Sequence, residues 1–298
     1  MISMKTKKRG ASQWAVAWRR FKKNRSGLVG LFIVLFYLTL GILSPWIAPY
    51  PSRSFQALYA GEAGEPPSPK HPFGTTRAGV DVFSEVIHGA RNDLYVGLLA
   101  TFIGTFLGVV IGAIAGYSKG EFSDLLLMLT QIFYSMPVLM LILMFSRVFS
   151  VLIVQGFGLT IIALLLGFFG WSGMAFITRG EILKIREMDY ILASKALGAS
   201  TFRILFKHVI PNVLTSIIIF ATLGIAGNIL TEVVISFLGF GDANTSTWGI
   251  IIQESITYMK TEWWAPLFPG LATVLVVIGF NLLGDGLSDA LNPRLREG

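Results

Sequence analysis

The stretch LYVGLLATFIGTFLGVVIGAIAGY, residues Leu94–Tyr117, contains no Asp, Glu, Lys, Arg, His or Pro, and it decides the fold class. A helix needs about 20 apolar residues to cross roughly 30 Å of bilayer hydrocarbon, because each backbone polar group must be satisfied within the segment. Five other charge-poor stretches have similar lengths: Leu28–Ile47, Leu125–Phe145, Leu159–Ile177, Val213–Val234 and Pro266–Leu283. The sequence therefore predicts an all-α integral membrane protein with six transmembrane helices.

The composition agrees with a membrane protein. Charged residues make up 14% of the chain, compared with about 25% in a typical soluble domain. The absence of cysteine excludes a disulfide framework and a thiolate metal site. His71, His88 and His208 are too dispersed to indicate a metal site, and no polar catalytic cluster is evident. We therefore expect no metal and no catalysis by this chain.

Basic residues predict the orientation in the membrane. Nine of them lie between Lys5 and Arg25, with no Asp or Glu among them. Such a block could bind nucleic acid, but an apolar stretch follows at once, which favours a cytoplasmic N-terminus beside the lipid bilayer. That stretch is longer than the 7–15 apolar residues of a signal peptide, so we expect a retained signal anchor. With the N-terminus inside, eighteen basic residues lie inside and six outside, which predicts an N-in/C-in topology in the cell membrane.

The chain divides into four predicted parts. Residues 1–26 form a basic cytoplasmic arm, and residues 27–90 hold the first transmembrane helix and an external Pro/Gly-rich segment. Residues 91–290 form a five-helix core with a cytoplasmic coupling loop at 179–210, and residues 291–298 form a cytoplasmic tail. Pro49–Gly79 is expected to be irregular, and Val80–Arg91 is expected to form a short interfacial helix.

The second predicted span carries small residues at four-residue spacing. They are Ala100, Gly104, Gly108, Gly112 and Gly116. This spacing places them on one helix face, where another backbone can approach closely. The neighbour could belong to the same subunit or to a second, pseudo-symmetric subunit, and we favour packing within one subunit.

Three residues within the spans are candidates for a gate or for the translocation path. Glu232 is the one carboxylate inside a predicted span, and an ionisable residue in a membrane is by default a functional candidate. Because it lies near a helix end, orienting the following bend is an equal alternative. Met136 and Pro137 predict a kink, since an interior proline removes a helix hydrogen bond.

The long loop from Glu181 to Pro211 has apolar positions at helical spacing, so it is not a flexible linker. It predicts two amphipathic helices, broken at Gly198 and ended at Pro211, where the next span begins. One alternative is a helix that lies on the inner leaflet. Asp189 and the small patch formed by Ala193, Ser194 and Ala196 favour docking against a protein.

This loop resembles the "EAA" loop of type I ABC importer permeases, E-A-A-x-x-x-G followed by I-x-L-P. Ala193, Gly198 and Pro211 match that pattern. Four positions depart from it: Leu192 for the Glu, Ser194 for the second Ala, His208 for the Ile and Ile210 for the Leu. The Leu192 departure removes a carboxylate, so no salt bridge to an ATPase is expected there.

Other segments resemble the C-type permease subunit of the dipeptide/oligopeptide and nickel subfamily. They include His71-Pro-Phe-Gly-Thr75, Tyr134-Ser-Met-Pro137, Ser236-Phe-Leu-Gly-Phe-Gly241, Trp248-Gly249 and the tail from Asn281 to Arg296. The resemblance covers roughly Arg19 to Arg296 and implies the type I importer permease fold.

The resemblance also implies a complex. Its partners are a second homologous permease in a heterodimer, two ABC ATPase subunits or domains, and an external substrate-binding protein. A coupling helix around Asp189–Ser200 is implied to sit in a groove of the ATPase. The residues assigned to coupling are Asp189, Tyr190, Ala193, Ser194, Ala196, Leu197, Gly198, Ala199, Ser200 and Arg203. No lysine directly follows a glycine, so the chain has no phosphate-binding G-x-x-x-x-G-K-[ST] loop, and ATP and Mg²⁺ are expected on the partners.

The expected function is therefore transport of di- or oligopeptides, with oligosaccharides or nickel as alternative cargoes of the same importer type. A stand-alone channel or an ion-coupled carrier is a different reading. Such carriers place several ionisable groups at mid-membrane, and the predicted spans lack them. A membrane-embedded enzyme would need a polar catalytic cluster that the sequence does not show.

Overall fold

The computed structural model describes residues 13–51, 61–204, 207 and 209–291. Several predictions fall partly outside these residues: the Lys5–Arg9 part of the basic arm, residues 52–60 of the external segment, positions 205, 206 and 208 of the coupling loop, and the tail at 292–298.

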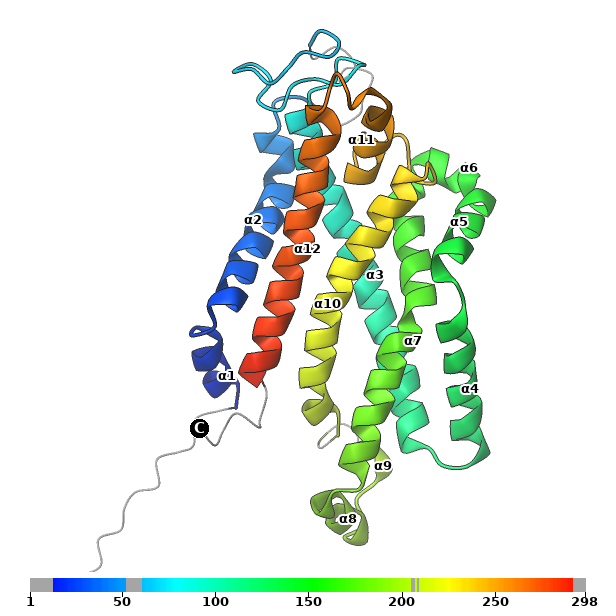
Figure 1. Cartoon of the computed structure of the whole chain (residues 1–298). Coiled ribbons are helices and arrows are strands. Elements are labelled where there is room, and N and C mark those ends of the chain that lie inside the picture. Colours follow the sequence, from blue (N-terminus) through cyan, green and yellow to red (C-terminus); the bar gives the residue numbers. More distant parts are fainter. Residues whose placement is uncertain (1–12, 52–60, 205–206, 208, 292–298) are drawn as a thin grey trace, which may run out of the picture.

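The described residues fold almost entirely into helices (Figure 1). In chain order these are α1 (Gln13–Phe21), α2 (Arg25–Ile47), α3 (Val82–Tyr117), α4 (Glu121–Ser135), α5 (Val138–Val148), α6 (Ser150–Leu152), a π-helical turn (Ile153–Phe157), α7 (Gly158–Arg186), α8 (Asp189–Ala196), α9 (Thr201–Ile204), α10 (Ile210–Phe237), α11 (Trp248–Ser255), a 3₁₀ turn (Ile256–Tyr258) and α12 (Trp264–Leu291). Among the described residues the sole β pairing is an isolated bridge between Thr75 and Asp81.

Five helical stretches are long and apolar enough to cross a membrane, and the bent pair α4–α5 makes a sixth if it counts as one span. The hydropathy prediction is therefore confirmed for five spans as single helices. The third predicted span is broken: α4 ends at Ser135, α5 begins at Val138, and the two are bent by 80°. A kink was expected at Met136-Pro137, and the bend lies there. The Met136 backbone is extended and Pro137 precedes the first turn of α5.

The predicted short interfacial helix at Val80–Arg91 is wrong as a separate element. Residues from Val82 onward belong to α3, which runs for 36 residues without a break. At 1.5 Å per residue this helix is about 54 Å long, well beyond the ~30 Å hydrocarbon core. Its polar first turns persist because Asp81 caps them, with its Oδ2 accepting from the Ser84 backbone N–H at 2.8 Å.

Figure 1 shows α2 and α12 side by side, α10 and α3 in the centre, and α7 flanked by the α4–α5 pair. α3 packs most extensively against α7. Helices α1, α8 and α9 lie at one end, which we call the α8 end, with the last residues of α12. The segment 61–81 and α11 lie at the opposite end, called the α11 end. Asn24 Nδ2 donates to Asp289 Oδ2 at 2.9 Å, which ties the start of α2 to the end of α12.

The segment 61–81 is irregular, as predicted, but it is tied down by specific contacts. His71 is fully buried, and its Nδ1 lies 2.8 Å from Asp81 Oδ1. The Trp264 indole N–H donates to the Thr75 carbonyl at 3.0 Å. The α3 cap and the start of α12 therefore both hold this segment, which closes the α11 end of the bundle.

Candidate coupling segment and translocation path

The predicted coupling loop projects from the α8 end as a short helical hairpin (Figure 1). α7 continues past the predicted end of its span to Arg186, whose guanidinium donates to the carbonyls of Gly116 and Ser118 at 3.2 and 3.4 Å. The end of α7 is thereby fixed to the end of α3. The prediction of two helices is corrected here: residues 179–186 extend α7, and α8 and α9 follow as separate short helices.

The turn between α8 and α9 is built on Gly198. Its φ is +79°, in the left-handed region that glycine adopts without strain. The Ala199 N–H donates to the Ser194 carbonyl at 3.1 Å, closing the end of α8 as in a Schellman turn. The Ser200 hydroxyl accepts from the Arg203 N–H at 3.4 Å and so caps α9. The predicted helix break at Gly198 is present.

The two faces of this hairpin differ sharply. Ile191 and Ile204 are buried in a cluster with residues of α7 and α10, which seats the hairpin on the bundle. The opposite face is open, and Leu197 is 88% exposed at the tip. Of the ten residues predicted to couple, Ser194 and Ala199 are half-buried and the others are exposed: Asp189, Tyr190, Ala193, Ala196, Leu197, Gly198, Ser200 and Arg203.

The structure places the glycines of α3 against α7 of the same chain. A Cβ on Gly108 would lie 2.6 Å from the Trp171 carbonyl oxygen, and one on Gly112 would lie 2.5 Å from that of Ala175. A Cβ on Gly116 would meet Ile182 at 3.1 Å, and one on Gly104 would meet Gly167 at 3.4 Å. The face thus serves close packing within one subunit.

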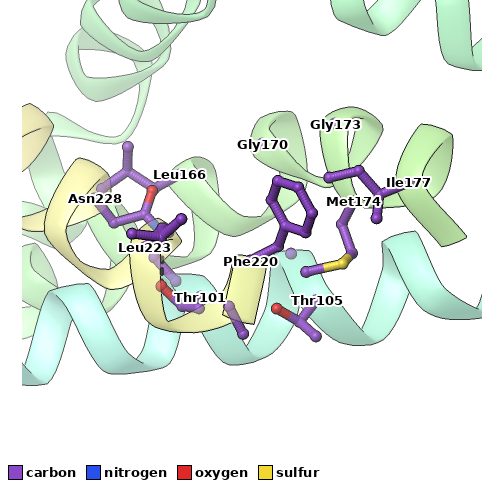
Figure 2. Close-up of a pocket in the computed structure, with 14 residues that line it drawn as sticks. Thr101, Thr105, Leu166, Gly170, Gly173, Met174, Ile177, Phe220, Leu223 and Asn228 are labelled. Atoms are coloured by element: carbon purple, nitrogen blue, oxygen red, sulfur yellow. Dashed lines mark hydrogen bonds between the residues drawn. The ribbon is translucent and has the colours of Figure 1, made fainter. Parts of the chain in front are cut away.

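A cavity of about 420 Å³ lies where α3, α7 and α10 meet (Figure 2). Its lining residues come from near the middle of each helix, including Thr101 and Thr105 from α3, Gly170 and Gly173 from α7, and Asn228 from α10. Asn228 Nδ2 donates to Thr101 Oγ1 at 2.9 Å. Sequence reasoning did not identify this site.

Glu232 does not line this cavity. Its side chain is fully buried near the α11 end, where Oε1 accepts from the Ser236 hydroxyl at 2.6 Å. Asp93 is also fully buried and lies beside Glu232, and its Oδ2 accepts from the Trp248 backbone N–H at 3.0 Å. Glu232 is thus part of the junction of α3, α10 and α11.

Trp248 completes this junction, and its role was missed in the sequence. It is fully buried, its indole N–H donates to the Val86 carbonyl at 3.0 Å, and its ring lies against Gly89. The family resemblance of the Trp248-Gly249 pair gives no information about its contacts. Met136 and Pro137 are absent from the lining of the α3–α7–α10 cavity, and their role as a gate stays a prediction. In the described part of the chain no group of His, Cys, Asp or Glu could hold a metal ion.

Comparison with known proteins gives the family. Residues 108–297 match the model for the inner membrane component of binding-protein-dependent transport systems. The chain belongs to this family. Residues 12–67 of this permease also match the model for the N-terminal transmembrane domain of oligopeptide transport permease C.

Curated relatives align over nearly the whole permease. It is 38% identical to the dipeptide transport system permease protein DppC of Bacillus subtilis (strain 168), over 94% of this chain and 86% of that protein. It is 33% identical to the oligopeptide transport system permease protein OppC of the same organism, over 98% and 93%. It is 32% identical to the glutathione transport system permease protein GsiD of Escherichia coli O157:H7, over 95% and 91%.

A solved structure supports the fold. The permease resembles a chain from an inward-facing conformation of the MetNI methionine ABC transporter with a TM-score of 0.58 and 18% identity. The match covers 70% of this chain and 97% of that chain. At this identity the likeness concerns the fold, which is that of a type I ABC importer permease.

Proposed function

We propose that this permease forms one half of the translocation path of an ATP-driven importer of di- or oligopeptides. A second, homologous permease supplies the other half in a heterodimer, and an external binding protein delivers the cargo. Two ABC ATPase subunits or domains bind ATP and Mg²⁺, and this chain performs no hydrolysis and binds no cofactor. The peptide-transport names of the relatives support this cargo.

The observation that carries the proposal is the α8–α9 hairpin. Its inner face is seated on α7 and α10, while Leu197 projects from its tip with 88% exposure. Burying a leucine side chain contributes about 1.5–3 kcal/mol, so this tip favours a protein partner over water. Movement of a partner ATPase would be transmitted through the hairpin to α7 and α10, and it would bias the permease between two access states.

The proposal includes the N-in/C-in topology. The charge asymmetry supports a cytoplasmic α8 end, because basic residues concentrate in the segments that lie there. The segment 61–81 and α11 then face the external binding protein.

Transport by the whole assembly tests the function. The permease is co-expressed with its partner permease and ATPases, reconstituted in proteoliposomes and supplied with the binding protein and a labelled dipeptide or tetrapeptide. We expect uptake that requires ATP. Uptake without ATP refutes the proposal of an ATP-driven importer. ATP-dependent uptake of an oligosaccharide or of Ni²⁺, without uptake of any peptide, refutes the proposal of a peptide cargo.

Single cysteines test the topology and the contact, since the native chain has none. Leu197→Cys is expected to cross-link to an ATPase subunit and to resist an impermeant thiol reagent added outside intact cells. Met259→Cys, an exposed position at the α11 end, is the matched control. It should react with the reagent added outside and form no cross-link to an ATPase subunit. Outside labelling of Leu197→Cys would contradict the orientation.

A further inference from the structure

The cavity between α3, α7 and α10 has a lining suited to a particular kind of cargo. Figure 2 shows Thr101, Thr105 and Asn228 among apolar and glycine residues, with Phe220 beside Met174. None of the residues that line it carries an ionisable side chain. Its volume of about 420 Å³ falls in the 300–1,000 Å³ range of small-ligand sites.

The polar groups of this cavity retain unused hydrogen-bonding capacity. Four threonines elsewhere on α4, α10 and α12 donate their hydroxyls to the carbonyl four residues earlier: Thr130, Thr222, Thr231 and Thr273. Thr105 makes no such bond and has no partner among the described residues. Asn228 donates one N–H to Thr101, and its amide has a second donor and a carbonyl acceptor. Thr105 and Asn228 are half-buried, so these unused groups are open to a ligand or to water.

The two glycines that α7 contributes to the cavity wall, Gly170 and Gly173, differ from the packing glycines of α3. A Cβ on Gly170 would meet nothing within 4 Å, and one on Gly173 would touch only the Tyr134 ring at 4.0 Å. A glycine in a helix interior is less favourable than alanine by about 1 kcal/mol. Packing within this chain offers no compensation at these two positions, so their absent side chains serve to keep the cavity open.

We propose that this cavity is a transit site for the main chain of the transported peptide, with Thr105 and Asn228 bonding peptide N–H and C=O groups. The inference rests on the proposed function and names the part of the cargo that is recognised. Every peptide presents the same main-chain groups, whatever its side chains. A neutral wall also avoids an unpaired buried charge, which would favour one cargo charge and oppose the other.

The lining also disfavours two other occupants. Nickel prefers imidazole and other N, O or S ligands in defined geometry, and no histidine, carboxylate or thioether set is present beyond the lone Met174. A packed helix of the partner permease would fill the open glycine surface, but its backbone N–H and C=O groups are already paired within the helix. They could not bond the spare N–H and C=O of Asn228. The main chain of a transported peptide would fit the open space and would pair with the unused N–H and C=O of Asn228.

The test uses the complete assembly in proteoliposomes and three labelled tripeptides: neutral, acidic and basic. Thr105→Val and Asn228→Leu remove hydrogen-bonding groups and keep similar volumes. We expect each to lower uptake about twofold to tenfold, by the same factor for all three peptides. Uptake at the wild-type level in both variants, or a loss confined to one peptide charge, overturns the proposal.

Filling the cavity gives a second measurement. Gly170→Leu is expected to lower uptake of all three peptides at least tenfold, while the permease still assembles with its partner permease and the ATPases. Gly227→Leu is the matched control, because a Cβ there also meets nothing within 4 Å but the residue does not line the cavity. It should transport normally.

Several outcomes count against the inference. Normal uptake by Gly170→Leu, or equal losses in Gly170→Leu and Gly227→Leu, overturns it. Loss of the partner permease from purified Gly170→Leu assigns the cavity to subunit contact and also overturns it. If the wild-type assembly takes up no peptide, the proposed function fails and the inference fails with it. If the wild-type assembly takes up peptide and every variant does so at the same level, the inference is overturned and the proposed function stands.

Discussion

Replacing Gly112 with alanine tests the packing of α3 on α7 at the α3 glycine whose added Cβ would lie nearest to α7. A Cβ there would lie 2.5 Å from the Ala175 carbonyl oxygen, 2.9 Å from the Thr178 Cβ and 3.0 Å from the Ala175 Cα. Two of these atoms are backbone, so relief requires α7 to move. Gly104 is the matched control on the same helix face, because its nearest contact would be an ordinary 3.4 Å.

The magnitudes follow from two opposing terms. Alanine in a helix is favoured over glycine by about 1 kcal/mol, and this gain applies at both sites. Inserting a methyl group into a packed interface costs about 1–3 kcal/mol, and this cost applies only at Gly112. Gly104→Ala is therefore expected to raise the free energy of unfolding by up to about 1 kcal/mol. Gly112→Ala should be less stable than Gly104→Ala by about 1–3 kcal/mol.

Both variants are purified in mixed detergent and lipid micelles and unfolded with increasing SDS. Tryptophan fluorescence is a suitable probe, because Trp171 is buried on α7 beside this interface. Equal stability of the two variants, or a more stable Gly112→Ala, would refute the argument that α3 and α7 touch backbone to backbone at Gly112.

Three more outcomes are expected. Trp248→Phe should lower the free energy of unfolding by about 0.5–1.5 kcal/mol through the lost indole bond, measured by the same SDS titration. Glu232→Gln should keep near-normal stability and uptake, because an amide can accept from Ser236 and donate to Asp93. Glu232→Ala should be clearly less stable. A Glu232→Gln variant that folds but does not transport would instead place Glu232 in the translocation path. Gly198→Leu, strained by about 1–2 kcal/mol in the left-handed region, should hydrolyse ATP with little peptide uptake, and a normal ratio of peptide to ATP would remove the coupling role.

Spans could be predicted because hydropathy is local, whereas the length of α3 could not. Glu85 and Asp93 look unsuited to a continuous membrane helix when only their neighbours in sequence are considered. Their partners lie far along the chain: Ser246 donates to Glu85 Oε1 at 2.9 Å, and the Trp248 N–H donates to Asp93. A single sequence gives no means of pairing residues so far apart, so the polar turns were assigned to a separate helix.

The turn of the hairpin at the α8 end could be predicted because its sequence pattern is local. The end of α7 before it could not. A glycine followed by a capping serine marks the turn after Gly198. The end of α7 was placed too early because charges at Arg179, Glu181 and Lys184 mark the edge of the hydrocarbon. A helix need not end where the membrane does. The Lys184–Glu181 pair at 2.8 Å and the bonds of Arg186 to α3 support its extension.

Glu232 lies apart from the neutral polar groups in the middle of the bundle. The sequence makes Glu232 a candidate because it is ionisable, yet its carboxyl group accepts from Ser236 and lies beside Asp93 near a helix end. The polar groups at the middle of the bundle are neutral and come from two helices: Thr101 and Thr105 from α3, and Asn228 from α10. A carrier driven by an ion gradient needs charge there to couple the ion. If ATPases drive the permease from its α8 end, as proposed, it needs no such charge, and a neutral interior would let cargo of either charge pass without a buried, unpaired ion.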